Sequence, residues 1–242
     1  MSSRRRTFSR LLALAVFLLL ASPLAAQVSD NFTRADNVSL GSNWTENEGQ
    51  TADFEIVSNQ LRVGDTNNAA MATWTGSAFA NDQSVTVTFA SNVGGGDYNL
   101  SLLVRGGGTR TTATGYVCQL KFNSGAGTTQ GAIDVLNTVN LTTPSSGTQL
   151  NGMANVGFNL AASDTFGCSV SGTTITLLHN GTSVFTAGSG GTFTSGVAGV
   201  VRVASIAGGG AINAGDVAFS LASFTGTSLP ASRRGTLLSV GP

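Results

Sequence analysis

Side chains that usually carry acid, metal or phosphate chemistry are scarce in this sequence of 242 residues. It has 12 basic and 12 acidic side chains, one histidine and two cysteines. A zinc site of the usual composition needs three or four histidine or cysteine ligands, and the chain offers only His179, Cys118 and Cys168. The only lysine is Lys121, and neither a Gly-x-x-x-x-Gly-Lys phosphate loop nor a Gly-x-Ser-x-Gly nucleophile turn occurs. These absences exclude the usual zinc hydrolases, P-loop enzymes and serine esterases.

Residues 1–26 have the three parts of an export signal. A basic stretch comes first, then an apolar run from Leu11 to Leu20, then small residues that end at Ala26. The basic residues are Arg4, Arg5, Arg6 and Arg10. Because the apolar run is too short to span a bilayer stably, we expect cleavage near Ala26 and a secreted or periplasmic protein. The arginines fit both the general secretory and the twin-arginine route, and the sequence leaves that choice open.

The chain after residue 26 is acidic and has no second long apolar run. Without the four arginines of the signal, eight basic side chains stand against 12 acidic ones, which gives a net charge of −4. A protein that binds nucleic acid by neutralising phosphates needs the opposite sign, so we expect no nucleic-acid partner. We also expect no membrane span in the mature chain.

Glycine, serine and threonine are abundant after residue 26, and glycine alone occurs 32 times. Helix formers are few and no stretch has helical periodicity over three turns, whereas alternation of apolar and polar residues is frequent. The clearest alternating runs are Gln83–Phe89, Tyr98–Arg105, Gly115–Phe122 and Phe166–Val170. A hairpin is predicted between Thr174 and Thr186, because Asn180-Gly181 suits the two positive-φ positions of a type I′ turn.

Short strands separated by polar turns predict an all-β fold. We expect two antiparallel sheets packed as a jelly-roll sandwich over residues 27–228, with a flexible tail at residues 229–242. A disordered chain is the alternative for such a composition, but the 41% of hydrophobic residues are placed at strand spacing, which argues against it.

Cys118 and Cys168 each share the parity of apolar neighbours in their strands, so both are expected to face the core. Export permits a disulfide between them. If the predicted strand 132–139 lay between theirs in one sheet, their Cα atoms would be about 9.6 Å apart, which is beyond bridging distance. The sequence therefore leaves open a disulfide and two buried thiols.

Seven short segments between Val28 and Thr227 follow one another in a distinctive order. They are Asp30–Asp36, Leu40–Trp44, Phe54–Leu61, Thr114–Leu120, Asp164–Gly172, Leu178–Val184 and Thr194–Gly199. Together they resemble the laminin-G-like, concanavalin A-like lectin and glucanase jelly rolls of exported bacterial proteins. The resemblance implies that the last strand, Asp216–Phe224, lies beside the first near Asn31 and Phe32, which would close a sheet edge.

The glucanases of that superfamily carry Glu-x-Asp-x-Glu on one strand, which puts alternate carboxylates on one face as nucleophile and acid/base. The glutamates here are Glu46, Glu48 and Glu55, and none stands in that pattern. We expect Glu46 and Glu48 to lie in a polar loop after Trp44. The departure favours a non-catalytic protein with no catalytic residue.

A polar sheet face is the candidate site for a glycan. If the apolar residues of segment 115–122 point inward, Gln119 and Lys121 point outward, and parity puts Arg105 and Asp134 on a comparable face. These four side chains can hydrogen-bond sugar hydroxyls, and an ordinary solvated sheet face is the alternative. Trp74 can stack on a sugar ring or belong to the core.

Three aspartates, Asp30, Asp36 and Asp216, are candidates for a calcium site near the joined termini, because calcium prefers hard oxygen ligands. Turn and capping roles are the alternative for these carboxylates.

The sequence thus predicts a secreted, non-catalytic carbohydrate-binding or adhesion module that binds a glycan or polysaccharide on a sheet face. A structural matrix or coat subunit that self-associates through sheet edges is one alternative. A sugar-processing hydrolase of the laminin-G-like type is the other.

Overall fold

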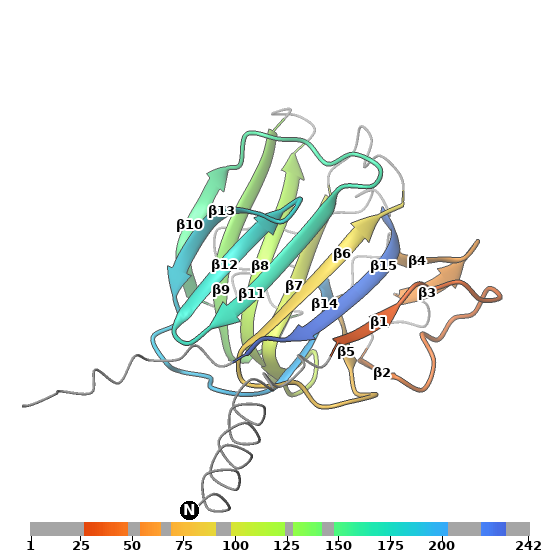
Figure 1. Ribbon diagram of the computed structural model, residues 1–242, viewed down its shortest axis with the longest axis horizontal. Coiled ribbons are helices and arrows are strands. Elements are labelled where there is room, and N and C mark those ends of the chain that lie inside the picture. The colour runs from red at the N-terminus through yellow and green to blue at the C-terminus, as the bar shows by residue number, and fades with distance from the viewer. Residues whose placement is uncertain are drawn as a thin grey trace, which may run out of the picture.

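The computed structural model describes residues 27–47, 54–63, 69–90, 98–123, 128–141, 148–202 and 219–230. Within these ranges the chain forms strands, turns and loops and no helix, and the strands build two antiparallel sheets packed face to face (Figure 1). This confirms the predicted all-β sandwich. The predicted signal peptide and residues 231–242 of the predicted tail lie outside the described residues. No helix long and apolar enough to cross a membrane is present in the described ranges.

Sheet A has eight strands and sheet B has seven. In spatial order, sheet A contains β13 (Thr182–Gly188), β12 (Thr174–His179), β11 (Thr165–Ser171), β6 (Gln83–Phe89), β15 (Phe219–Ser228), β4 (Gln60–Val63) and β3 (Phe54–Val57), with β1 (Gln27–Asp30) paired to β15. Sheet B contains β10 (Thr148–Asn155), β9 (Thr128–Val139), β8 (Ala113–Asn123), β7 (Tyr98–Gly107), β14 (Val197–Arg202), β5 (Ala70–Trp74) and β2 (Trp44–Asn47).

Strands β11, β12 and β13 form the meander that their sequence predicts. Asn180 and Gly181 connect β12 to β13 with φ angles of 50° and 74°, the left-handed values that a type I′ turn requires. Gly172, with φ 56°, lies in the turn between β11 and β12. The local turn chemistry is therefore enough to set the order of these three strands.

The first and last described strands lie side by side, as the resemblance implies. Strand β1 pairs antiparallel with β15, and Asp30 is opposite Phe224. Phe32 and Phe224 are both 0% exposed. Strand β15 is described from Phe219 onward, and the expected start of the last strand, Asp216, lies outside the described residues.

An aromatic group fills the core between the sheets at the end where β2 and β5 meet β15. The Trp44 ring packs edge-on against Trp74 and Phe224, with centroid distances of 5.4 and 4.8 Å. Trp74 stacks on Phe224 at 6.0 Å and is 5% exposed. The hypothesis that Trp74 stacks on a sugar is therefore wrong, because its ring is already buried against other aromatic rings.

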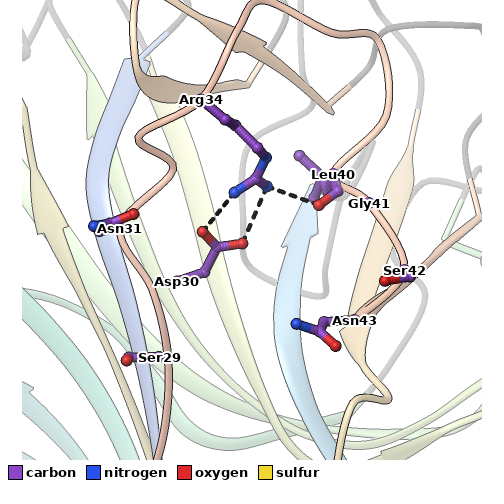
Figure 2. A pocket seen from close by; sticks show the side chains of 8 residues that line it. All are labelled: Ser29, Asp30, Asn31, Arg34, Leu40, Gly41, Ser42 and Asn43. Carbon is purple, nitrogen blue, oxygen red and sulfur yellow. Dashed lines mark hydrogen bonds and ion pairs between the residues drawn. The ribbon is translucent and has the colours of Figure 1, made fainter.

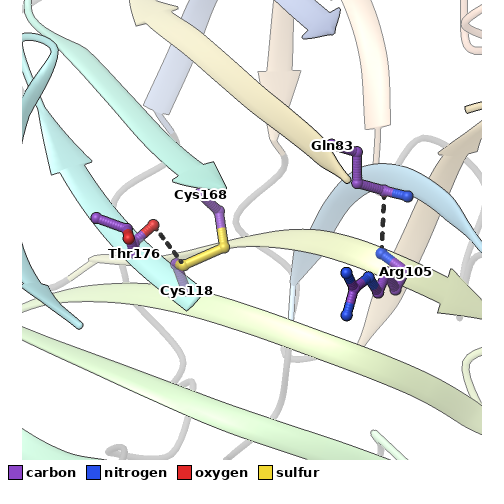
Figure 3. The surroundings of a disulfide bond; sticks show 5 residues. All are labelled: Gln83, Arg105, Cys118, Cys168 and Thr176. Atoms are coloured by element: carbon purple, nitrogen blue, oxygen red, sulfur yellow. Dashed lines mark hydrogen bonds between the residues drawn. A yellow bond between two sulfur atoms is a disulfide. The ribbon is translucent and has the colours of Figure 1, made fainter. Parts of the chain in front are cut away.

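Cys118 and Cys168 form a disulfide that joins the two sheets (Figure 3). Cys118 is on β8 of sheet B and Cys168 is on β11 of sheet A, with their Cα atoms 5.5 Å apart. The arrangement with one strand between them in a single sheet is therefore wrong. Parity alone placed both side chains in the core, and the bond forms because their strands face each other across it.

Loss of this cross-link should lower the free energy of unfolding. Closing a loop with a sequence separation of 50 residues restricts the unfolded chain by about 4 kcal/mol in the chain-entropy description. We expect Cys118→Ala/Cys168→Ala to unfold at lower urea concentration than the oxidised protein.

The wild-type protein with its disulfide reduced is the matched control, because it lacks the cross-link without the cavity that alanine leaves. If the reduced and oxidised proteins unfolded at the same urea concentration, the disulfide would contribute nothing to stability.

Candidate functional site

The outer face of sheet B, which points away from sheet A, is apolar over part of its area and polar over another part. On β8, Tyr116, Cys118 and Leu120 pack into the core between the sheets, as parity predicts. The residues between them therefore lie on the outer face. The apolar part of this face is formed by Ala69, Met71, Leu103, Ala113, Val117, Leu136, Leu141 and Val201.

Four polar side chains on β7, β8, β9 and β10 lie on the same face, beside this apolar part. We call Ser101, Gln119, Asp134 and Gln149 the buried polar cluster. Ser101 is directly opposite Gln119, and Asp134 is directly opposite Gln149. Asp134 is also opposite Val117, two residues before Gln119 on β8, so the two pairs are diagonal neighbours on the sheet. The strands that carry them are adjacent in Figure 1.

The buried polar cluster holds polar atoms that the described part of the chain leaves without hydrogen-bond partners. These atoms are both carboxyl oxygens of Asp134, the Ser101 hydroxyl and the Gln149 side-chain nitrogen. Asp134, Ser101 and Gln119 are each 0% exposed. Burial of polar atoms without partners costs about 1–3 kcal/mol per group, so the cluster is expensive for the folded chain.

Burial raises the pKa of the Asp134 carboxyl to about 8, because desolvation disfavours the charged form. At neutral pH the carboxyl of the ligand-free protein is therefore mostly protonated. A protonated carboxyl can donate one hydrogen bond and accept others.

Stability should consequently depend on pH through Asp134. Between about pH 5 and about pH 8 the folded chain holds a proton on Asp134 that the unfolded chain has released, so the free energy of unfolding falls as pH rises. The expected slope is up to about 1.4 kcal/mol per pH unit in that window. Asp134→Asn should flatten the slope, and urea denaturation at several pH values measures both proteins. Equal slopes for the variant and the wild type would contradict the raised pKa.

Gln119 and Asp134 thus lie on the outer face as predicted, and Lys121 follows Gln119 on the same face of β8 and is half-buried. Ser101 and Gln149 were not predicted as site residues. Strand alternation in each segment indicates their parity, but only the register between neighbouring strands reveals that they lie beside Gln119 and Asp134.

Arg105 does not belong to this face, and its prediction as a ligand-binding residue is wrong. The pairing of β7 with β8 is irregular between Val104 and Gly107, and Arg105 has a φ of 48°. This bulge turns the side chain away from its expected direction. Its backbone N–H donates a hydrogen bond to the side-chain oxygen of Gln83 at 3.0 Å (Figure 3).

The Arg105 guanidinium is 4% exposed and connects loops from both sheets. It forms an ion pair with Asp82 at 3.1 Å and donates to three backbone carbonyls. The carbonyls belong to Asn81, Phe193 and Gly172, at 2.7, 3.1 and 2.9 Å. Arg105 therefore has a structural role.

Removal of the guanidinium should destabilise the fold strongly. Arg105→Met leaves the Asp82 carboxylate buried without its cation, which typically costs about 3–5 kcal/mol. Arg62→Met is the control, because it breaks the exposed pair with Glu55, which is worth at most about 1 kcal/mol. Chemical denaturation measures both, and similar losses for the two variants would contradict the assigned role of Arg105.

Asp30, one of the candidate calcium ligands, is bound by protein groups (Figure 2). Its carboxylate receives two hydrogen bonds from Arg34, at 2.7 and 3.1 Å, and one from the Trp44 indole at 2.9 Å. Burial opposes ionisation of Asp30, but these hydrogen bonds outweigh it and hold the pKa of the carboxyl below its usual value. A pocket of about 420 Å³ borders this pair, lined also by Ser29, Asn31, Leu40, Gly41, Ser42 and Asn43.

The other two candidate calcium ligands are not seen beside Asp30. Asp36 accepts a hydrogen bond from the Ser58 backbone at 2.8 Å, and Asp216 lies outside the described residues. No cluster of three or more potential metal ligands occurs within the described ranges. Calcium binding by Asp30, Asp36 and Asp216 stays a prediction.

Glu46 and His179 have local partners. Glu46 is on β2, not in a loop, and its carboxylate accepts hydrogen bonds from the Ser39 hydroxyl and the Leu40 backbone. His179 lies 3.3 Å from the Asp164 carboxylate and stacks on the Phe158 ring at 3.7 Å. These contacts tie loops to strand ends.

Comparison with known proteins establishes the fold. No protein-family model matches the chain, and no curated protein sequence matches it. Solved structures do match. A glycoside hydrolase family 16 endo-glucanase from Bacteroides ovatus is 14% identical with a TM-score of 0.50, covering 81% of this chain and 98% of that one. An endo-β-1,3-glucanase from Pyrococcus furiosus is 12% identical with a TM-score of 0.53, covering 86% and 96%.

A mannose-bound domain is similar to the same degree. The exoplasmic/lumenal domain of VIP36, in a form bound to Ca²⁺ and mannose, is 13% identical with a TM-score of 0.53, covering 79% of this chain and 85% of that one. The chain therefore has the concanavalin A-like jelly-roll fold, which both glucanases and lectins share. At these identities the likeness concerns the fold alone.

Proposed function

We propose that the protein is an exported, non-catalytic carbohydrate-binding module whose site is the outer face of sheet B around the buried polar cluster. The observation that carries the proposal is the set of buried polar atoms at Asp134, Ser101 and Gln149 that have no partners among the described residues. A folded chain gains nothing from such atoms, so a ligand that satisfies them explains their presence.

The chemistry of the cluster suits sugars. Each sugar hydroxyl donates one hydrogen bond and accepts others, and neighbouring hydroxyls on a ring are spaced to meet neighbouring side chains. Asp134 offers two oxygens, the Gln149 nitrogen is a donor, and the Ser101 hydroxyl can donate or accept. The apolar residues beside the cluster, such as Leu103 and Val117, can pack against the C–H groups on the face of a sugar ring.

The positions of the carboxyl groups support binding over hydrolysis. Glycosidases need two carboxyl groups about 5–10 Å apart. On sheet B the described strands carry two carboxyl groups, Asp134 on β9 and Glu46 on β2, which are separated by five strand spacings or about 24 Å. Glu46 is also held by Ser39 and Leu40.

The fold supports the same substrate class. The neighbouring structures include glucanases and the mannose-bound domain of VIP36, so this scaffold carries carbohydrate sites in other proteins. The export signal predicted for residues 1–26 agrees with a protein that meets glycans outside the cytoplasm.

Binding to a glycan array followed by titration calorimetry tests the proposal. We expect the protein without residues 1–26 to bind a set of glycans, and Asp134→Asn to weaken that binding about tenfold or more, because the amide nitrogen cannot accept a hydrogen bond from a sugar hydroxyl and an unpaired buried group costs about 1–3 kcal/mol. A second array with a calcium chelator tests the calcium prediction.

Glu55→Gln is the matched control, because it also removes one carboxylate but lies on β3 of sheet A. It should bind glycans as the wild type does. Self-association without glycan binding would support a structural subunit and overturn the proposal. Release of reducing sugar that Asp134→Asn abolishes would support a hydrolase and also overturn it.

A further inference from the structure

Asp134 has no cation within reach in the described part of the chain. Lys121 is the charged residue on β8, and it is opposite Gln130, four residues along β9 from Asp134 or about 13 Å. Strand β10 carries no charged residue. On β7, Arg105 is bound to Asp82, and on β12, across the core, His179 is bound to Asp164.

The groups nearest to Asp134 are instead neutral. Gln149 is directly opposite on β10 and Val117 is directly opposite on β8. The Gln149 nitrogen and both Asp134 oxygens are buried and lack partners within the described residues. The two Asp134 oxygens and the Gln149 nitrogen thus lie side by side, and the described residues offer no positive charge there to neutralise an acidic ligand.

We propose that Asp134 and Gln149 determine the specificity of the site for uncharged sugars, and that Asp134 gives up its proton as two adjacent sugar hydroxyls bind. The proposal rests on the function proposed above. The two hydroxyls donate to the two Asp134 oxygens, the Gln149 nitrogen donates to one of the hydroxyl oxygens, and the Asp134 proton passes to solvent.

The proton is released because the bound sugar lowers the pKa of the Asp134 carboxyl group. In the ligand-free protein, burial raises the pKa of Asp134 to about 8. Hydrogen bonds donated to a carboxylate favour its charged form, so the pKa falls in the complex. Affinity therefore rises as pH rises from about 5 to about 8, by up to about tenfold per pH unit.

An acidic sugar is disfavoured for the same reason. A uronate would add a second negative charge beside Asp134. Among the described residues, the nearest cation on this face is Lys121, which is beyond the about 8 Å over which salt leaves exposed charges unscreened. Because Asp134 is 0% exposed in the ligand-free chain, any sugar must also expose it, which lowers the apparent affinity.

Titration calorimetry of the full mature chain tests the proposal with four probes. Laminaritetraose, cellotetraose and mannotetraose are uncharged, and tetragalacturonate is the acidic probe. Titrations at about pH 6.5 in buffers of different ionisation enthalpy count the protons released. We expect an uncharged probe to bind with release of close to one proton, and to bind about tenfold or more tightly than tetragalacturonate.

Two variants distinguish the role of Asp134 from a general effect of charge. Asp134→Asn should bind the same uncharged probe more weakly, without proton release and with an affinity that does not change between about pH 5 and 8. Glu55→Gln on sheet A should keep both the affinity and the proton release of the wild type. Gln149→Leu should weaken binding and keep the proton release.

The outcomes separate this inference from the proposed function. Binding of an uncharged probe without proton release, or tighter binding of tetragalacturonate, overturns the inference and leaves a carbohydrate-binding protein. If none of the four probes and no glycan on the array binds, the proposed function and the inference both fail.

Discussion

The apolar layer between the two sheets is the constraint on which the rest of the structure depends. Because side chains alternate along a strand, every residue that packs into this layer forces its neighbours onto the opposite face. On β8, Cys118 and Leu120 face sheet A, so Gln119 faces outward. A slip of one residue would exchange the two faces. The Cys118–Cys168 disulfide adds a covalent link across the same layer.

The outer face of sheet B buries both apolar side chains and a carboxyl group. Met71, Leu103 and Val201 bury apolar surface, which stabilises the fold, whereas Asp134 beside them buries a carboxyl group at a cost. Apolar residues across the whole face would give a more stable protein. Natural proteins place destabilising residues mainly at functional sites. The buried carboxyl group of Asp134 among apolar residues is therefore the feature of this face on which the proposed function depends.

Arg105 and Asp134 differ in how well the surrounding residues satisfy their buried polar atoms. Both are buried ionisable residues on sheet B. The Arg105 guanidinium has a carboxylate and three carbonyls as partners, so its neighbourhood is complete without a ligand. Neither carboxyl oxygen of Asp134 has a hydrogen-bond partner among the described residues, and the proposed glycan site rests on this difference.

The sequence alone determined the features that depend on neighbours along the chain. Alternation predicted β6 with its bounds, the Asn180-Gly181 turn predicted the hairpin of β12 and β13, and parity put Cys118 and Cys168 in the core. Only the tertiary structure decided which strands face each other and in which register. That is why it paired the two cysteines across the sheets, placed Ser101 and Gln149 beside Gln119 and Asp134, and enclosed Trp74 among aromatic rings. It also turned Arg105 away at a bulge, because the conformation of one residue can reverse the direction that strand alternation predicts.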